Sequence, residues 1–124
     1  MSKFFVATAA LLMFLGVALG AFGAHGLSDY FEKFPKLAGT FETAVKYHIY
    51  HALGLLAVGI LARAETSSLL NWSGYLLLAG LLIFSGSLYI LVATNKSWLG
   101  AITPIGGVAM LAGWACLFLY AIRY

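Results

Sequence analysis

Histidine and tyrosine side chains gather at the head of one apolar run. The stretch KYHIYHALGLLAVGIL, residues 46–61, opens with one lysine, two histidines and two tyrosines and then becomes apolar. Tyr47 and His51 are four residues apart and share one face of a helix, as do His48 and His51 at a spacing of three. Imidazole and phenol groups so placed can bind a metal, relay protons or hydrogen-bond to a neighbouring helix.

The composition of the chain indicates where this chemistry must act. Of its 124 residues, 63% are hydrophobic and 9% are charged, and the mean hydropathy is +0.98. A soluble domain carries about 25% charged residues. We therefore expect a single integral membrane domain over residues 1–124, with the lipid bilayer as its main partner. The net charge of +3 comes from scattered Lys and Arg at segment ends, which argues against a nucleic-acid partner.

Four apolar stretches are each long enough to cross a bilayer, which takes about 20 residues of helix. Backbone amides in lipid need partners within the protein, and no strand periodicity is present. The expected fold class is therefore all-α, a four-transmembrane-helix bundle with helices at about residues 4–24, 41–63, 72–94 and 99–122. The first of these resembles a signal peptide, but it is long enough to span and is expected to be retained.

An even number of crossings places both termini on one side of the membrane. We call this side face A; it also carries the connection 63–71, and face B carries the connection 25–42 and the turn at residues 95–96. Basic residues are nearly balanced between the faces, but acidic residues dilute the charge of face B, which favours a cytoplasmic face A. Aromatic residues expected in interfacial belts are Trp72, Tyr120 and Tyr124 at face A, and Tyr30 and Trp98 at face B.

The connection 25–42 carries the pattern of a short helix. Leu27, Tyr30 and Phe31 recur at helical spacing behind a Ser28 or Asp29 cap, and a proline then ends the pattern. This predicts an amphipathic helix on the face B interface, between the first and second transmembrane helices.

The start of the second transmembrane helix carries a cap signal and an ion pair. Thr40 is expected to cap it, with Glu42 in its first turn and Lys46 four residues further on as the partner of Glu42.

Polar side chains from all four helices lie toward face B. His25 closes the first span, and His48 and His51 lie roughly 8 to 13 Å inside the second at about 1.5 Å per residue. The face A half of the spans is nearly pure apolar. Because a polar group facing lipid costs several kcal/mol, these side chains are expected to point inward and to satisfy one another. The candidate polar cluster or ligand site is His25, Tyr47, His51, Ser85, Ser87, Tyr89 and Thr103.

Small residues recur at the spacing of helix-packing seams, which lets helices approach closely. The residues expected to serve packing or backbone geometry are Gly16, Gly20, Gly23, Gly54, Pro104, Gly106, Gly107 and Gly113. Two alternatives remain for the last helix: it starts at Pro104 with Thr103 as its cap, or it starts near Leu99 and is kinked at Pro104.

Four motifs together resemble a known family. They are GAFGAHGL at the end of the first span, Y-x-x-x-H-A-L from Tyr47, FSGSLY from Phe84, and TPIGG with LAGWA between Thr103 and Ala115. In this order they are similar to the small four-helix membrane proteins of the YgdD and YwdK group, a domain of unknown function (DUF423). The resemblance implies a mostly bacterial inner-membrane protein without an established activity. It also implies that relatives commonly carry Gln in place of His48, which argues against a mechanism that needs three histidines.

A metal or haem site is one function class to consider. Its candidate ligands would be His25, His48 and His51. No carboxylate or thiolate lies obviously beside them, and no His-Glu-x-x-His motif is present. We therefore expect neither a bound metal nor a cofactor.

Two further function classes remain. A histidine and tyrosine cluster titrates near neutral pH, so an oligomer of the chain could act as a proton-linked or small-solute transporter or channel. No ionisable residue continues the path through the face A half, however. We favour a non-catalytic membrane module, of an assembly, accessory or lipid-interacting kind, in which the polar cluster locks the helices in register. A homo-oligomer stays open, and the sequence indicates no particular protein partner.

Overall fold

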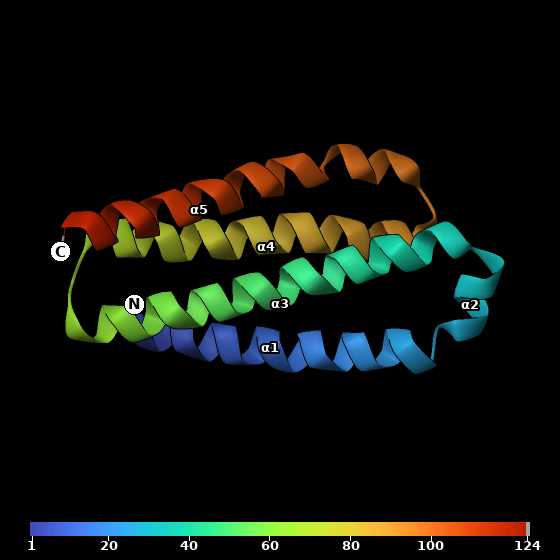
Figure 1. Cartoon of the computed structure of the whole chain (residues 1–124), viewed down its shortest axis with the longest axis horizontal. Helices are drawn as coiled ribbons and strands as arrows, with labels where there is room; N and C mark the ends of the chain where they lie inside the picture. Colours follow the sequence, from blue (N-terminus) through green and yellow to red (C-terminus); the bar gives the residue numbers. More distant parts are fainter. Residues whose placement is uncertain (124) are drawn as a thin grey trace.

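The helices follow the order that the apolar pattern predicts. The computed structural model of the chain describes residues 1–123, and Tyr124, expected in the face A aromatic belt, lies outside them. In the described part the elements are α1 (Ser2–His25), α2 (Ser28–Lys33), α3 (Pro35–Ala64), α4 (Ser68–Thr94), the 3-10 helix η1 (Ser97–Ala101) and α5 (Thr103–Arg123). Four segments are long and apolar enough to cross a membrane, and a short helix lies between the first two, which confirms the expected fold class. The start of α1 and the end of α5 lie at the same end of the molecule (Figure 1).

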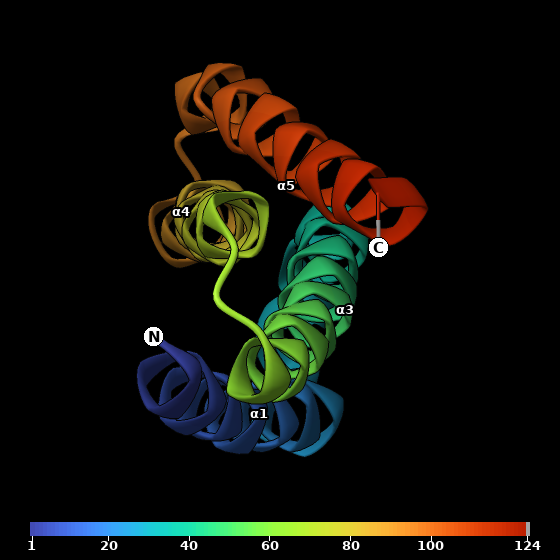
Figure 2. The ribbon, with the colours of Figure 1, turned by 90° about the vertical axis from the view of Figure 1, so that its left-hand side faces the viewer.

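The four long helices pack in a fixed order. Figure 2, an end view, shows α3 and α4 side by side in the middle, with α1 and α5 on opposite sides of this pair. The closest-packed pairs are α4 with α5, α1 with α3, and α3 with α4. The outer faces of α1 and α5 carry large exposed apolar side chains such as Phe14 and Leu111, each 71% exposed. Such faces are suited to acyl chains and not to water.

Helix α2 covers the face B end of the pair α3 and α4. Its residues Tyr30 and Phe31 pack with Phe41 of α3 and Val92 of α4, and the Tyr30 hydroxyl donates to the Val92 carbonyl oxygen at 2.6 Å. The expected cap is wrong: the N-cap position is Leu27, which forms no side-chain cap. The Ser28 hydroxyl instead donates back to the carbonyl of the last residue of α1 at 3.2 Å.

Helix α3 begins at Pro35, which both ends α2 and occupies the first turn of the next helix. A proline is tolerated there because the first backbone amides of a helix have no intrahelical acceptor. The expected cap at Thr40 is wrong because this residue lies inside the helix, where its hydroxyl donates to the Lys36 carbonyl at 3.4 Å. The ion pair of Lys46 with Glu42 is confirmed, with 3.3 Å between nitrogen and oxygen.

The connection between α4 and α5 is tight. Asn95 adopts the left-handed conformation, with φ 54°, and its amide donates to the Leu91 carbonyl at 2.7 Å. Asn tolerates this conformation better than most residues with a side chain, so α4 ends here. After η1, α5 begins at Thr103 with Pro104 in its first turn, close to the first of the two alternatives.

Glycines allow α4 and α5 to touch backbone to backbone. A Cβ atom on Gly80 would lie 2.7 Å from the amide nitrogen of Met110 and 2.8 Å from the carbonyl oxygen of Gly106. A Cβ on Gly113 would lie 3.0 Å from the amide nitrogen of Leu77. No side chain fits at such distances, so this seam requires glycine. Gly107 differs, because its Cβ would meet only the Phe84 ring, at 3.8 Å.

Substitutions at adjacent glycines test this seam. Gly106→Ala should lower the free energy of unfolding in detergent by about 1–3 kcal/mol, because the methyl group would push against the backbone of α4. Gly107→Ala should leave stability unchanged or slightly higher, because space is open there and alanine favours helix. Thermal unfolding followed by circular dichroism measures both. Equal losses for the two variants would contradict the packing described.

Candidate functional site

The imidazole of His48 lies where α1, α3 and α4 meet. It is 4% exposed, its Nε2 lies 2.7 Å from the Leu12 carbonyl oxygen, and its Nδ1 lies 2.8 Å from the Tyr89 hydroxyl. A carbonyl oxygen can only accept, so Nε2 carries the proton and donates to Leu12. In the neutral ring Nδ1 is then an acceptor for the Tyr89 hydroxyl. One side chain of α3 thus binds both neighbouring helices.

Gly16 makes the room for this ring. A Cβ atom on Gly16 would lie 3.4 Å from both Cδ2 and Nε2 of His48, and 3.0 Å from Cγ1 of Ile49. The missing side chain lets the imidazole approach the backbone of α1 closely enough to donate to the carbonyl of Leu12. The small-residue pattern of the first span therefore serves a hydrogen bond as well as packing.

Hydroxyl side chains make further hydrogen bonds between helices. The Ser85 hydroxyl donates to the Ala44 carbonyl of α3 at 2.8 Å, and the Ser87 and Thr103 hydroxyls are 2.6 Å apart across α4 and α5. The Ser73 hydroxyl donates to the Gly113 carbonyl at 2.8 Å. Within residues 1–123 no buried side-chain nitrogen or oxygen lacks a hydrogen-bond partner. These bonds form separate links between helices and do not meet at one point.

His51, one turn further along α3, contacts different partners from His48. Its Nδ1 donates to the carbonyl of Tyr47 in its own helix at 2.8 Å, and its ring stacks on the Tyr47 ring at 5.9 Å. The Trp114 ring of α5 approaches its edge, with the centroids 5.8 Å apart. His51, Tyr47, Phe84 and Trp114 line a groove of about 360 Å³ between α3 and α5.

The expected cluster residues therefore divide into three groups. Ser85, Ser87, Tyr89 and Thr103 make bonds between helices, and Tyr47 and His51 line the groove. His25, the last residue of α1, is exposed at face B and is not part of either group.

The residue that sequence reasoning left out of the cluster is His48. The glutamine that the family resemblance implies for relatives at this place argues only against a mechanism that needs three histidines. Glutamine and neutral histidine each offer a hydrogen-bond donor and an acceptor. This shared property is the sequence signal for a side chain at position 48 that bridges two partners.

A metal site finds no geometric support among the described residues. Between residues 1 and 123 no three His, Cys, Asp or Glu side chains come together in a way that could hold a metal ion. His48 has both ring nitrogens in hydrogen bonds.

The face A half is more polar than its sequence indicated. The Ser2 hydroxyl donates to the Gly59 carbonyl at 2.6 Å, and the Tyr120 hydroxyl donates to Oε2 of Glu65 at 2.7 Å. Together with the buried Ser73, these contacts tie the helix ends at this face. Polar side chains therefore hold both ends of the bundle, although Ser2 and Glu65 lie outside the spans expected at residues 4–24 and 41–63.

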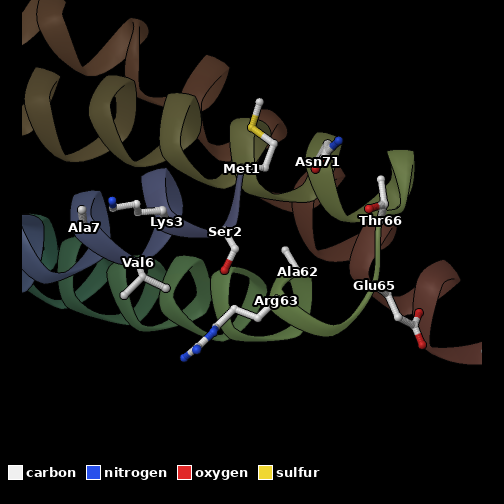
Figure 3. Close-up of a pocket in the computed structure, with 10 residues that line it drawn as sticks. All are labelled: Met1, Ser2, Lys3, Val6, Ala7, Ala62, Arg63, Glu65, Thr66 and Asn71. Atoms are coloured by element: carbon white, nitrogen blue, oxygen red, sulfur yellow. The ribbon is translucent and has the colours of Figure 1, made fainter.

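An open hollow also lies at this face. It measures about 760 Å³ and is lined by the start of α1, the end of α3 and the segment that leads into α4 (Figure 3). We call it the face A pocket. Its cationic side chains are Lys3 and Arg63, and no carboxylate of the described residues lies within ion-pair distance of either. Figure 3 shows the carboxylate of Glu65, which Tyr120 binds, directed away from both.

Comparison with known proteins identifies the family of the chain. The family model described as "Protein of unknown function (DUF423)" matches residues 19–107. The chain belongs to the DUF423 family. The UPF0382 membrane protein YwdK of Bacillus subtilis is 46% identical over 124 residues, covering 98% of each chain. A UPF0382 membrane protein of Staphylococcus haemolyticus is 44% identical over 122 residues, also covering 98% of each.

A more distant DUF423 relative is the UPF0382 inner membrane protein YgdD of Escherichia coli. It is 38% identical over 122 residues, covering 98% of this chain and 92% of YgdD. No solved structure matches the chain. The resemblance seen in the four motifs is confirmed, and this DUF423 chain is a multi-pass membrane protein.

Variants of His48 test its bridging role. His48→Ala should lower the free energy of unfolding in detergent by about 1–2 kcal/mol, because the Leu12 carbonyl and the Tyr89 hydroxyl lose a partner. His48→Gln should recover most of this loss, because an amide keeps both a donor and an acceptor.

The matched control is His25→Ala, which removes an exposed imidazole and should leave the unfolding free energy unchanged. Unfolding by heat or denaturant, followed by tryptophan fluorescence, compares the three variants. A glutamine variant as unstable as the alanine variant would contradict the bridge.

Proposed function

We propose that this DUF423 protein is a non-catalytic membrane module that acts by binding lipid, with its polar side chains holding four helices in one register. The observation that carries the proposal is the face A pocket, in which two cationic side chains line an open hollow and form no ion pair with a carboxylate of residues 1–123, Glu65 of the lining included.

The engagement of the buried polar groups supports a non-catalytic role. A nucleophile or a general base must be able to reach a substrate. Both nitrogens of His48 are taken up by protein partners, and the hydroxyls of Ser73 and Ser85 donate to backbone carbonyls. These groups stabilise contacts between helices, which contribute about 0.6 kcal/mol each on average in membranes.

The chemistry of the face A pocket supports binding of an anionic headgroup. Lys3 comes from α1 and Arg63 from α3, so the two cations flank the hollow from different helices. Guanidinium and ammonium groups are the usual protein partners of phosphate. Thr66 and Asn71 add a hydroxyl and an amide to the lining. A volume of about 760 Å³ lies in the range of small-ligand pockets, roughly 300–1,000 Å³.

The position of the pocket at the helix ends also supports lipid as its ligand. Headgroups lie where transmembrane helices meet water, and basic side chains at this level contribute about 1 kcal/mol each to binding of an anionic lipid surface. The glycerol and acyl parts of such a lipid would lie against the exposed outer face of α1.

Removal of the two cations tests the proposal. Added phosphatidylglycerol should raise the melting temperature of the wild-type protein in detergent more than phosphatidylcholine does. The double variant Lys3→Gln with Arg63→Gln should bind phosphatidylglycerol about 10- to 30-fold more weakly, because two basic contacts are lost.

The matched control is Lys33→Gln with Lys36→Gln, which removes the same charge at face B and should retain the preference for the anionic lipid. Equal behaviour of the two double variants, or of the two lipids, would contradict the proposal. Proton flux into vesicles that depends on His51 would support the transport alternative instead.

A further inference from the structure

One ring nitrogen of His51 has no hydrogen-bond partner among residues 1–123. The ring is 6% exposed, and its Nδ1 donates to the Tyr47 carbonyl oxygen at 2.8 Å. This bond fixes the proton on Nδ1, so in the neutral ring Nε2 is an acceptor. Among the described residues no hydrogen-bond donor reaches Nε2. Because no fully buried side-chain nitrogen or oxygen in residues 1–123 lacks a partner, Nε2 is at least partly accessible from outside the protein.

His51 lines the groove between α3 and α5, which we call the His51 groove. Its walls are aromatic: Tyr47 packs on Phe84 with the ring centroids 4.6 Å apart, and Trp114 closes the side next to His51. Val108 and Leu111 form the outer rim and are 66% and 71% exposed. The groove therefore opens toward the acyl chains and combines aromatic walls with one hydrogen-bond acceptor.

The depth of the groove limits what can enter it. His51 lies five residues further into α3 than Lys46, or about 7–8 Å along the helix axis. Lys46 and Glu42 form an exposed ion pair, which belongs at the level of the headgroups. Below that level a charged group is costly, so a ligand of the groove must be neutral. It must also donate a hydrogen bond, because Nε2 can only accept.

We propose that the His51 groove binds a membrane-dissolved phenol. The phenol hydroxyl donates to Nε2 of His51, and the ring packs between Tyr47 and Trp114, since aromatic rings prefer offset or edge-to-face contacts with other rings. The apolar tail runs over Val108 and Leu111 into the lipid. This site lies in the face B half and uses different residues from the face A pocket, so each site can be tested without the other.

A pair of probes that differ only in the donor tests this inference. The full chain in phosphatidylcholine nanodiscs is titrated with 4-nonylphenol and, separately, with 4-nonylanisole, its methyl ether. At ten times its Kd the phenol should raise the melting temperature by about 3 °C more than the ether does. In protein labelled with ¹⁵N at histidine, the Nε2 resonance of His51 should shift with the phenol and not with the ether.

Three variants locate the effect. Gly107→Leu should abolish the difference between the probes, because leucine fills the groove at a position where a Cβ meets only the Phe84 ring. His51→Phe should abolish it by removing the acceptor, and His25→Phe, at an exposed histidine, should retain it.

Two outcomes would overturn the inference. One is an equal response to the phenol and the ether in the wild-type protein. The other is a phenol preference that survives Gly107→Leu. If His51→Phe fails to fold, the Gly107 variant and the Nε2 resonance decide the question, because both leave the imidazole in place.

Discussion

The hydrogen bonds of one imidazole hold the central contacts of this bundle. His48 donates to a carbonyl of α1 and accepts from a hydroxyl of α4, so the rotation of α3 about its axis is set relative to both neighbours. In lipid, apolar side chains give helices little reason to choose one rotation over another, because acyl chains satisfy them equally well. The fixed rotation of α3 then places His51 at the groove and Ala44 opposite Ser85.

Hydrogen bonds between helices also fix the packing along the other helix pairs. Serine hydroxyls donate to backbone carbonyl oxygens of a neighbouring helix. A carbonyl oxygen has two lone pairs, so it can accept this bond in addition to the one within its own helix. Glycines bring the backbones close enough for these short side chains to reach, as at Gly113, whose carbonyl accepts from Ser73. Close packing and hydrogen bonding are therefore two results of the same small residues.

The sequence predicts the helices well and the side-chain partners poorly. Apolar runs of sufficient length determine the four spans, and the aromatic spacing around Tyr30 predicts the short helix between the first two. The partners of His48 could not be derived, because they depend on how closely Gly16 lets α1 approach. Neither could the face A pocket, because it joins residues of α1 to residues about 60 positions later. The position of His25 at the end of the first span also did not predict that its side chain is exposed.

Helix α3 presents its two buried histidines in opposite hydrogen-bonding states. His48 donates through Nε2, and His51 donates through Nδ1. Nitrogen NMR spectra of the wild-type protein in bilayers, labelled with ¹⁵N at histidine, distinguish the two tautomers directly. We expect a neutral Nε2–H ring for His48 and a neutral Nδ1–H ring for His51. A His48 ring protonated on Nδ1 alone, or one that exchanges freely between tautomers, would contradict this expectation.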